Sequence, residues 1–231
     1  MENSTTICIM TFSRRFDIFK QTLQSIREQS DIGIYVAVNG DYGKEFDNEY
    51  RIAMLNECLK YDNVYCNFYL TFRGCAKIWN DCIINCGSEH IIVTNDDVQM
   101  RHGFIPDFIS HIEDTSVKEL IRVNDSFSTF YINKQFMDSK GYFNEYYLGI
   151  GWEDFEFNER SKGGVYSSFH SDKYSNLYAE HLDLVDQHAS IECGKYHRYN
   201  SLIYKQGPAH GVNFRPYEKS YMDNYHTFWT I

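Results

Sequence analysis

The segment 149–157 (GIGWEDFEF) holds the residues of this chain whose types and spacing best suit chemistry. Glu153 and Asp154 are adjacent carboxylates at the start of a helix-like run, so one can orient a ligand while the other takes a proton. Trp152, which follows a glycine, adds an aromatic plane of the kind on which a sugar ring stacks. The alternative interpretation is an acidic helix N-terminus, which the helix dipole favours without any chemical role.

A second acidic cluster, 95–98 (NDDV), follows an expected buried strand. The carboxylates of Asp96 and Asp97 are hard oxygen ligands on a short turn, which suits Mg²⁺ or Mn²⁺ bridging a diphosphate. The alternative is a polar turn held by side-chain hydrogen bonds. His188 follows an apolar-polar alternation that is typical of a strand, and this setting makes it a candidate metal ligand. Most of the nine histidines are expected on the surface or in the core.

Composition limits the classes of protein that this chain can represent. Its 231 residues fit one domain, and a hydrophobic content of 43% is enough for a full core. The formal charge of −10 argues against a nucleic-acid partner, which needs a basic face. An anionic ligand would need a bridging cation or a local cluster of Arg and Lys to overcome this charge. The acidity therefore points to a metal.

The seven cysteines are odd in number and form no CxxC pair, so we expect reduced thiols in a cytoplasmic-type compartment. Cys82 and Cys86 share a helix face, where core packing is favoured over metal binding. We expect no signal peptide, because no basic region followed by an apolar run is present. No apolar stretch approaches the roughly 20 residues of a membrane span. Peripheral contact with the inner face of a membrane is compatible with this pattern, and the oligomeric state stays open.

Hydrophobic periodicity predicts strands alternating with helices in the first half of the chain. This rhythm indicates βαβ units and a largely parallel sheet, in which ligands bind beyond the carboxyl ends of the strands. The second half is less regular, with an aromatic, glycine-punctuated loop before a helix in which Glu156 and Arg160 pair along one face. Strands are expected at 7–11, 34–38, 64–70, 91–94 and 128–132, and helices from 16, at 47–60, from 74 and at 154–162. Candidate ligand-binding ends are 11–14, 38–41, 70–74 and 95–97.

Seven short motifs follow one another along nearly the whole chain. They are 11–14 (TFSR), 73–76 (RGCA) with Asn80, 95–98 (NDDV), 141–145 (GYFNE), 153–156 (EDFE) with Arg160, 188–190 (HAS), and 204–207 (YKQG) with 214–216 (FRP). In this order they resemble the T-Y/F-N-R, N-x-G-x-A…N, DXD, G-x-F-D/N-E, E-D-x-D/E-x-x-x-R, H-x-x-S or H-x-S, and K-W-G…F-x-x-P motifs of family-2-type glycosyltransferases with the GT-A fold. Each motif is weak singly, and their common order makes the resemblance strong. The segment GIGWED also resembles the W-G-G-E-D loop of galactosyltransferases and chondroitin-type polymerases, where Trp and Glu face the acceptor.

The resemblance implies an α/β fold of the GT-A nucleotide-diphospho-sugar transferase type, with one Rossmann-like, mostly parallel sheet flanked by helices. It implies a single catalytic domain over 1–231, with a nucleotide-binding half at 1–100, an acceptor-binding half at 101–215 and a C-terminal tail at 216–231. A divalent cation, Mn²⁺ or Mg²⁺, would be held by Asp97 and His188. The residues implied to contact the donor are Thr11, Phe12, Arg14, Asn39, Arg73, Gly74, Asn80, Asn95 and Asp96.

The same resemblance implies a metal-dependent, inverting transfer of a sugar from a nucleotide-diphosphate donor to a glycan, glycolipid or other hydroxyl acceptor. Asp154 would deprotonate the acceptor hydroxyl, while Glu153 and Trp152 would position the acceptor. Capsular, lipopolysaccharide and viral glycan synthesis are all compatible, with a cytoplasmic location in each case. The first DXD position is Asn95, so Asp97 is expected to make most of the metal contact. The acidic residue that often reads uracil aligns with Val38 or Asn39, which leaves guanine and thymine open as bases.

Three other functions remain as alternatives. A retaining transferase or a sugar nucleotidyltransferase could use the same sheet, although the latter usually has a glycine-rich basic loop after the first strand, and residues 11–16 contain no glycine. A non-catalytic module that binds carbohydrate or nucleotide would keep the aromatic loop but would not need Asp97, Asp154 and His188 together. A phosphatase that attacks through aspartate would place its nucleophile at Asn95, which forms no acyl phosphate.

Overall fold

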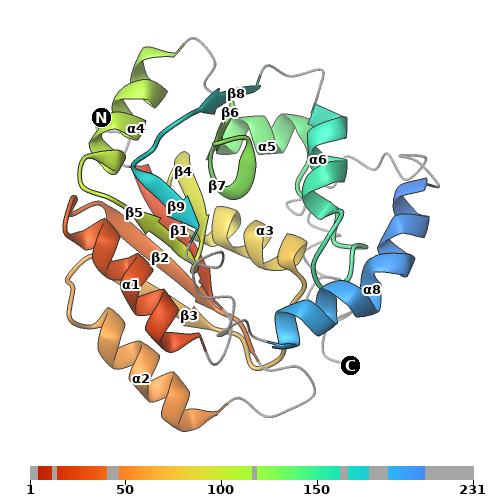
Figure 1. Ribbon diagram of the computed structural model, residues 1–231, viewed down its shortest axis with the longest axis horizontal. Helices are drawn as coiled ribbons and strands as arrows, with labels where there is room; N and C mark the ends of the chain where they lie inside the picture. Colours follow the sequence, from red (N-terminus) through yellow and green to blue (C-terminus); the bar gives the residue numbers. More distant parts are fainter. Residues whose placement is uncertain are drawn as a thin grey trace.

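The computed structural model describes residues 5–11, 15–40, 47–115, 119–161, 166–176 and 187–205. Strands and helices alternate in its first half, as the hydrophobic periodicity predicts (Figure 1). The first half contains β1 (Thr5–Thr11), α1 (Phe16–Arg27), β2 (Gly33–Val38), α2 (Asn48–Cys58), β3 (Val64–Phe68), α3 (Cys75–Asn85), β4 (His90–Asn95) and β5 (Val98–Met100). The second half contains α4 (Phe104–Asp114), β6 (Leu120–Val123), β7 (Ser126–Asn133), α5 (Lys134–Lys140), α6 (Glu153–Ser161), β8 (Tyr166–Phe169), β9 (Tyr174–Asn176) and α8 (Gln187–Lys205).

The main sheet has seven strands in the order β3-β2-β1-β4-β7-β6-β8. Strands β1 to β4 pair in parallel, while β7 runs antiparallel to both β4 and β6, and β6 pairs with β8 in parallel. A separate two-stranded sheet joins β5 to β9. The prediction of an α/β fold with a mostly parallel, helix-flanked sheet is therefore confirmed.

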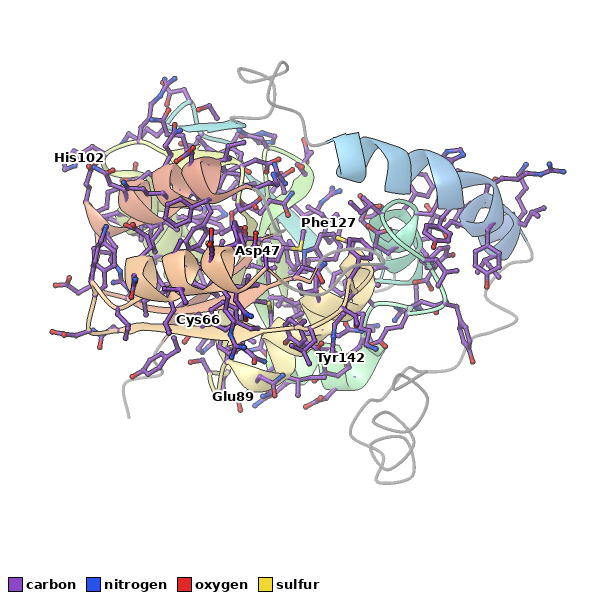
Figure 2. All side chains as sticks on the ribbon, turned by 90° about the horizontal axis from the view of Figure 1, so that it is seen from below. Asp47, Cys66, Glu89, His102, Phe127 and Tyr142 are labelled. Atoms are coloured by element: carbon purple, nitrogen blue, oxygen red, sulfur yellow. The ribbon has the colours of Figure 1, made fainter. Side chains whose placement is uncertain are left out.

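Helices cover both faces of the sheet, so its central strands are apolar on both sides. On one face, Ile7 and Ile9 of β1 pack in a cluster with the buried side chains of α1, α2 and α4. On the other face, Cys8 and Met10 pack with α3, α5 and α6. Figure 2 shows the side chains filling the space on both sides of the strands. Alternate side chains of β1 thus point to opposite faces of the sheet, and both faces are covered by helices. This gives three layers, helix, sheet and helix, and explains why β1 is hydrophobic along most of its length.

Several element boundaries differ from those expected. The third strand ends at Phe68 instead of 70, and Leu70 is 69% exposed. Helix α2 begins at Asn48 because the side chain of Asp47 (Figure 2) accepts hydrogen bonds from the backbone N–H groups of Glu49 and Tyr50. His188, expected after a strand, lies in the first turn of α8.

The structure also bears on two further expectations, namely reduced cysteines and the absence of an apolar stretch long enough to span a membrane. Six cysteines lie among the residues whose side chains are described, and all six are free thiols. Cys82, on α3, packs in the core rather than in a ligand cluster. Among the helices described, none is both long and apolar enough to cross a membrane.

Candidate active site

The polar ends of three parallel strands meet at one edge of the sheet. Thr11 of β1 pairs with Val38 of β2, and Met10 pairs with Asn95 of β4. Thr11, Asn39 and the turn after Asn95 therefore lie at neighbouring strand ends, where ligands bind in open α/β sheets. Phe12 and Arg14, from the first of the seven motifs, lie outside the described residues.

The acidic turn after β4 is buried and is paired with an arginine. Asp96 is fully buried and Asp97 is 7% exposed. The guanidinium of Arg15, just before α1, places one nitrogen 2.9 Å from Oδ1 of Asp96 and the other 2.9 Å from Oδ2 of Asp97. Oδ1 of Asp97 and Oδ1 of Asn95 are buried and have no hydrogen-bond partner among the described residues. The turn thus holds two carboxylates, paired with Arg15 from the start of α1, and two buried oxygens without a hydrogen-bond partner among the described residues.

Two neighbouring side chains hold this turn and Arg15 in place. The hydroxyl of Thr22 in α1 lies 2.6 Å from the carbonyl of Asp96 and 2.8 Å from that of Val98. The hydroxyl of Tyr50 in α2 is hydrogen-bonded to the side chain of Thr11 and to the backbone of Arg15. Burial raises the pKa of Tyr50 and the charge of Asp96 adds to the shift, so this hydroxyl stays neutral.

The side chain of Asn39 is occupied by the loop that leads into α3. Its amide donates to the carbonyl of Arg73 at 2.8 Å, and its Oδ1 accepts from the Arg73 N–H at 2.8 Å. Gly40 allows this approach, because a Cβ there would lie 2.5 Å from the backbone of Thr71. Asn39, expected to contact the donor, therefore also fixes the Arg73 loop at the strand end.

The start of α3 carries two cations. The Arg73 guanidinium lies over the ring of Tyr69, with 4.1 Å to the centroid, and pairs with Asp81. Burial, followed by the nearby charge of Arg73, lowers the pKa of Lys77 to about 8. Asp81 and Glu145 lie close enough to offset part of this positive charge, so Arg73 and Lys77 are cations within a mixed-charge group at the N-terminal end of a helix, where an anionic group can bind.

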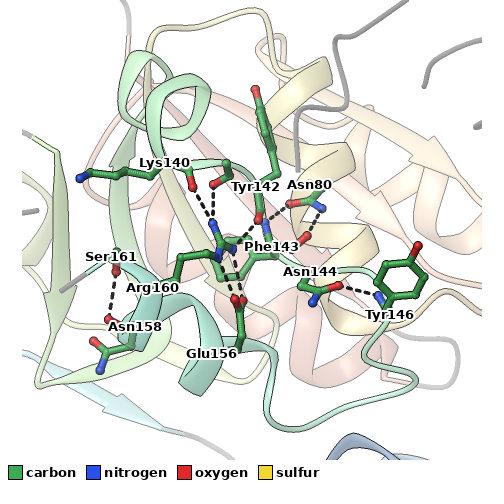
Figure 3. Close-up of polar contacts among 11 residues, drawn as sticks. Asn80, Lys140, Tyr142, Phe143, Asn144, Tyr146, Glu156, Asn158, Arg160 and Ser161 are labelled. Atoms are coloured by element: carbon green, nitrogen blue, oxygen red, sulfur yellow. Dashed lines mark hydrogen bonds and ion pairs between the residues drawn. The ribbon is translucent and has the colours of Figure 1, made fainter. Parts of the chain in front are cut away.

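The loop before α6 packs directly on the start of α3. The N–H of Cys75 donates to the carbonyl of Gly149 at 2.7 Å. A Cβ on Gly74 would lie 3.2 Å from the backbone of Gly149, so a larger residue would push the two segments apart. Farther along α3, Asn80 is fully buried and exchanges hydrogen bonds with both backbone groups of Phe143 (Figure 3). The acidic motif of α6 is therefore joined to the strand ends through α3.

Glu153 and Asp154 have different environments, as their adjacency predicts. Glu153 is 3% exposed, accepts a hydrogen bond from the Cys75 thiol, and has no hydrogen-bond partner at Oε2 among the described residues. Burial, and then the charge of Asp154, raises its pKa to about 7. Asp154 is half-buried, and its Oδ1 accepts from the N–H of Phe155 at 2.8 Å. Only Asp154 of the two presents appreciable surface.

The predicted pairing of Glu156 with Arg160 is present, and it does more than stabilise one helix. Nε of Arg160 lies 2.8 Å from Oε1 of Glu156. The same guanidinium donates to the carbonyls of Lys140, Gly141 and Tyr142 (Figure 3). The E-D-x-D/E-x-x-x-R motif thus ties α6 to the end of α5.

Trp152 adopts a backbone conformation that is rare for a bulky residue. Its φ is +78°, beside Gly151 at +108° and Gly149 at +63°. Its ring packs against Tyr204 of α8, with centroids 5.0 Å apart, and against His197 at 5.6 Å. The sequence predicts an aromatic plane here, and the structure shows one already packed on the C-terminal part of α8.

Asn200 of α8 is a residue of this site that the sequence motifs do not include. It is fully buried, exchanges hydrogen bonds with the N–H and carbonyl of Leu148, and donates to the carbonyl of Gly151 at 2.9 Å. A signal for it exists, since Asn200 shares the inner face of α8 with Tyr196, Ile203 and Tyr204. The side chain of His188 lies outside the described residues. Among those described, no group of three or more His, Cys, Asp or Glu gathers as a metal site.

Comparison with known proteins bears on the fold. No protein-family model matches the sequence, and no curated protein matches it. The solved structure of the mannosyltransferase PcManGT from Pyrobaculum calidifontis, in complex with GDP-Man and Mn²⁺, matches with a TM-score of 0.59 and 12% identity over 74% of this chain and 55% of that one. This chain therefore spans about half of the mannosyltransferase.

Two further solved structures match in the same way. S. aureus TarS 1–349 has a TM-score of 0.60 at 13% identity, over 96% of this chain and 74% of that one. GalNAc-T7, solved with UDP, GalNAc and Mn²⁺, has a TM-score of 0.59 at 8% identity, over 74% of this chain and 45% of that one. These likenesses show the fold, which is of the GT-A type.

Proposed function

We propose that this chain is a metal-dependent, inverting glycosyltransferase that moves a sugar from a nucleotide-diphosphate donor to a hydroxyl acceptor, a glycan or glycolipid. The observation that carries the proposal is the joining of two acidic pairs at one sheet edge. Asp96 and Asp97 lie beyond β4, and Glu153 and Asp154 are held there through contacts that run from Asn39 to α3 and on to Gly149. The fold neighbours solved with GDP-Man or UDP support the choice of donor class.

The residues of the acidic turn suit a divalent cation. Oδ1 of Asp97 and Oδ1 of Asn95 are buried oxygens without a hydrogen-bond partner among the described residues, and Mg²⁺ and Mn²⁺ prefer such ligands. Asp97 would hold the ion, with His188 as the second protein ligand. When bound, the cation would offset the charge that develops on the leaving diphosphate.

The cations at the start of α3 suit the donor phosphates. Arg73 is 27% exposed on its side chain, so it can turn toward a ligand, and Lys77 adds charge behind it. Thr11 and Asn39 lie at the strand ends where the nucleoside would rest. Positive charge on this edge would offset the repulsion between an anionic donor and an acidic chain.

Asp154 is the proposed base, because it is the more accessible carboxylate of its pair. It would take the proton of the acceptor hydroxyl as that hydroxyl attacks the anomeric carbon on the side opposite the diphosphate. Glu153, almost fully buried beside Trp152, would orient the acceptor. The strained backbone of Trp152 and its packing on Tyr204 would hold the ring where an acceptor sugar stacks.

A screen followed by one substitution tests this function. Thermal unfolding with UDP, GDP or dTDP plus MnCl₂ identifies the donor base, because a ligand of the native state raises the melting temperature. Asp154→Asn keeps the shape of the side chain and loses the base, so transfer is expected to fall by about 10² to 10⁴ while nucleotide affinity stays unchanged.

Asp62→Asn, at an exposed carboxylate after α2, is the matched control. Full transfer in Asp154→Asn would remove the base assignment. Retained anomeric configuration in the product would remove the inverting mechanism. Nucleotide binding without transfer to any acceptor would favour a binding module.

A further inference from the structure

The buried contact between Arg15 and the acidic turn is unusual for a site that would hold a divalent cation. Both carboxylates of the turn already have a positive partner, since Arg15 reaches Asp96 and Asp97 with separate nitrogens at 2.9 Å. The Arg15 side chain is 9% exposed, and those of Asp96 and Asp97 are 1% and 10% exposed. Arg15 therefore lowers the net charge of the group from −2 to −1, in a place that is nearly inaccessible to water.

Arg15 is held in this position by neighbouring elements. It is the residue before α1, and its backbone is hydrogen-bonded to the hydroxyl of Tyr50 from α2. Thr22 fixes the backbone of the acidic turn from the opposite side, through the carbonyls of Asp96 and Val98. Because both partners are fixed, the planar guanidinium spans the two carboxylates with little further loss of side-chain freedom.

The pairing with Arg15 leaves one carboxylate oxygen of the acidic turn without a hydrogen-bond partner among the described residues. Oδ2 of Asp97 is taken by Arg15, while Oδ1 of the same carboxylate is buried without a hydrogen-bond partner among the described residues. A buried carboxylate oxygen without a partner is costly, so the turn is poised for another cation. An ion arriving at this oxygen meets the repulsion of the Arg15 charge a few ångströms away, which is strong where water is excluded.

We propose that Arg15 is a built-in counter-cation that keeps a free divalent ion out of the acidic turn until a nucleoside diphosphate arrives. The diphosphate brings negative charge that offsets both cations, so metal and nucleotide bind cooperatively and neither binds well alone. Arg15 acts as a positioning residue that sets the order of binding. The inference rests on the proposed function of the turn as the metal-diphosphate site.

The direct test is the affinity of the protein for MnCl₂ alone, measured by calorimetry and by the electron paramagnetic resonance signal of free Mn²⁺. Arg15→Gln removes the charge, and we expect it to bind Mn²⁺ at least about tenfold more tightly than the native chain. Arg15→Lys keeps the charge but cannot span both carboxylates, so an intermediate affinity is expected. Lys60→Gln is the matched control, because it removes an equal charge from an exposed lysine, which pairs with the buried Glu57.

Stability gives a second readout. Arg15→Gln leaves two buried carboxylates without their partner, so its melting temperature is expected to fall and to recover with MnCl₂ alone. Should this variant fail to fold, Arg15→Gln combined with Asp96→Asn keeps the same net charge as the native group. This double variant frees Asp97 from its partner, and it is also expected to bind Mn²⁺ more tightly than the native chain.

Equal Mn²⁺ affinity in the native chain and the folded Arg15 variants would overturn the proposal. Loss of UDP and GDP binding in Arg15→Gln, with unchanged Mn²⁺ affinity, would overturn it too, since Arg15 would then be a phosphate ligand. In the native chain, UDP or GDP is expected to raise Mn²⁺ affinity, and this coupling is expected to shrink in Arg15→Gln. If neither nucleotide binds the native chain, the proposed function fails, whereas the comparison with metal alone still decides the role of Arg15.

Discussion

Glu153 offers a quantitative test of how the acidic motif is built, through the pH dependence of stability. Its folded pKa of about 7 compares with an ordinary value of 4.5, and the group is almost fully buried. The folded chain therefore retains a proton on Glu153 over a pH range in which the unfolded chain has lost it. The stability that this provides is fully present below about pH 4.5 and is lost as the pH rises through 7.

The rise of the Glu153 pKa from 4.5 to about 7 is worth about 3 kcal/mol of unfolding free energy between low pH and pH 8. Glu153→Gln imitates the protonated acid and is neutral at every pH, so it removes this loss. Relative to the native chain, we expect the variant to gain about 2 to 3 kcal/mol in going from pH 5 to pH 8. For a chain of 231 residues this is roughly 5 to 10 °C in melting temperature.

The measurement is thermal unfolding of both proteins at pH 5 and pH 8 at one ionic strength. Differences between the two proteins cancel the titration of groups that do not interact with Glu153, and Asp154 is the neighbouring carboxylate that does. Glu113→Gln, at an exposed position of α4, is the matched control and is expected to follow the native chain. An identical pH dependence in the native chain and Glu153→Gln would refute the assignment of a buried, protonated Glu153.

Three shorter predictions concern the metal and the α8 contact. Nucleotide binding is expected to require a divalent cation, so calorimetry with EDTA should show a large loss of nucleotide affinity. Asp97→Ala should lower this affinity more than Asn95→Ala does, because only Asp97 brings a formal charge to the ion. His188→Ala is expected to weaken Mn²⁺ binding without lowering the melting temperature, and the reverse pattern would make His188 a structural residue. Asn200→Ala leaves the backbone groups of Leu148 and Gly151 unpaired, so we expect a loss of about 2 to 3 kcal/mol in stability and a raised KM for the acceptor, with donor affinity unchanged.

Much of the fold can be predicted from the sequence, because two features of the first half of the chain indicate it independently. The apolar runs give the parallel strands, and the polar residues directly after them give the ligand-binding edge. Thr11, Asn39 and Asn95 were predicted at neighbouring strand ends, and the register of β1 with β2 and β4 places them there. The antiparallel insertion of β7 next to β4 was not predicted, since strand order depends on packing among distant segments.

The partners within the site were harder to predict. The first motif includes Arg14, which lies outside the described residues, and no motif includes Arg15, which reaches Asp96 and Asp97. His188 follows an alternation that resembles a strand, but the chain forms α8 there, because short alternations do not fix helix or strand by themselves. Asn200 belongs to no motif, and its spacing with Tyr196, Ile203 and Tyr204 marks an inner helix face without showing that this face packs on the loop 148–151.

Three buried asparagines connect segments of the site that are far apart in the sequence. The side chains of Asn39, Asn80 and Asn200 are all fully buried, and each pairs with the N–H and the carbonyl of a single residue in another segment. An asparagine amide has the donor and acceptor of a peptide group, so it can satisfy irregular backbone that has no strand beside it.

The three residues held in this way are Arg73, in the loop before α3, and Phe143 and Leu148, in the segment between α5 and α6. These loops carry the glycines and the strained Trp152, where regular hydrogen bonding is absent from the described backbone. An aspartate in place of any of the three asparagines would lose the donor and add a buried charge, so the amide is what the geometry requires. Asn39 holds the loop before α3, and Asn80 and Asn200 hold the segment before α6, so these three amides position the loops that carry Arg73 and Trp152, although only Asn80 belongs to a motif.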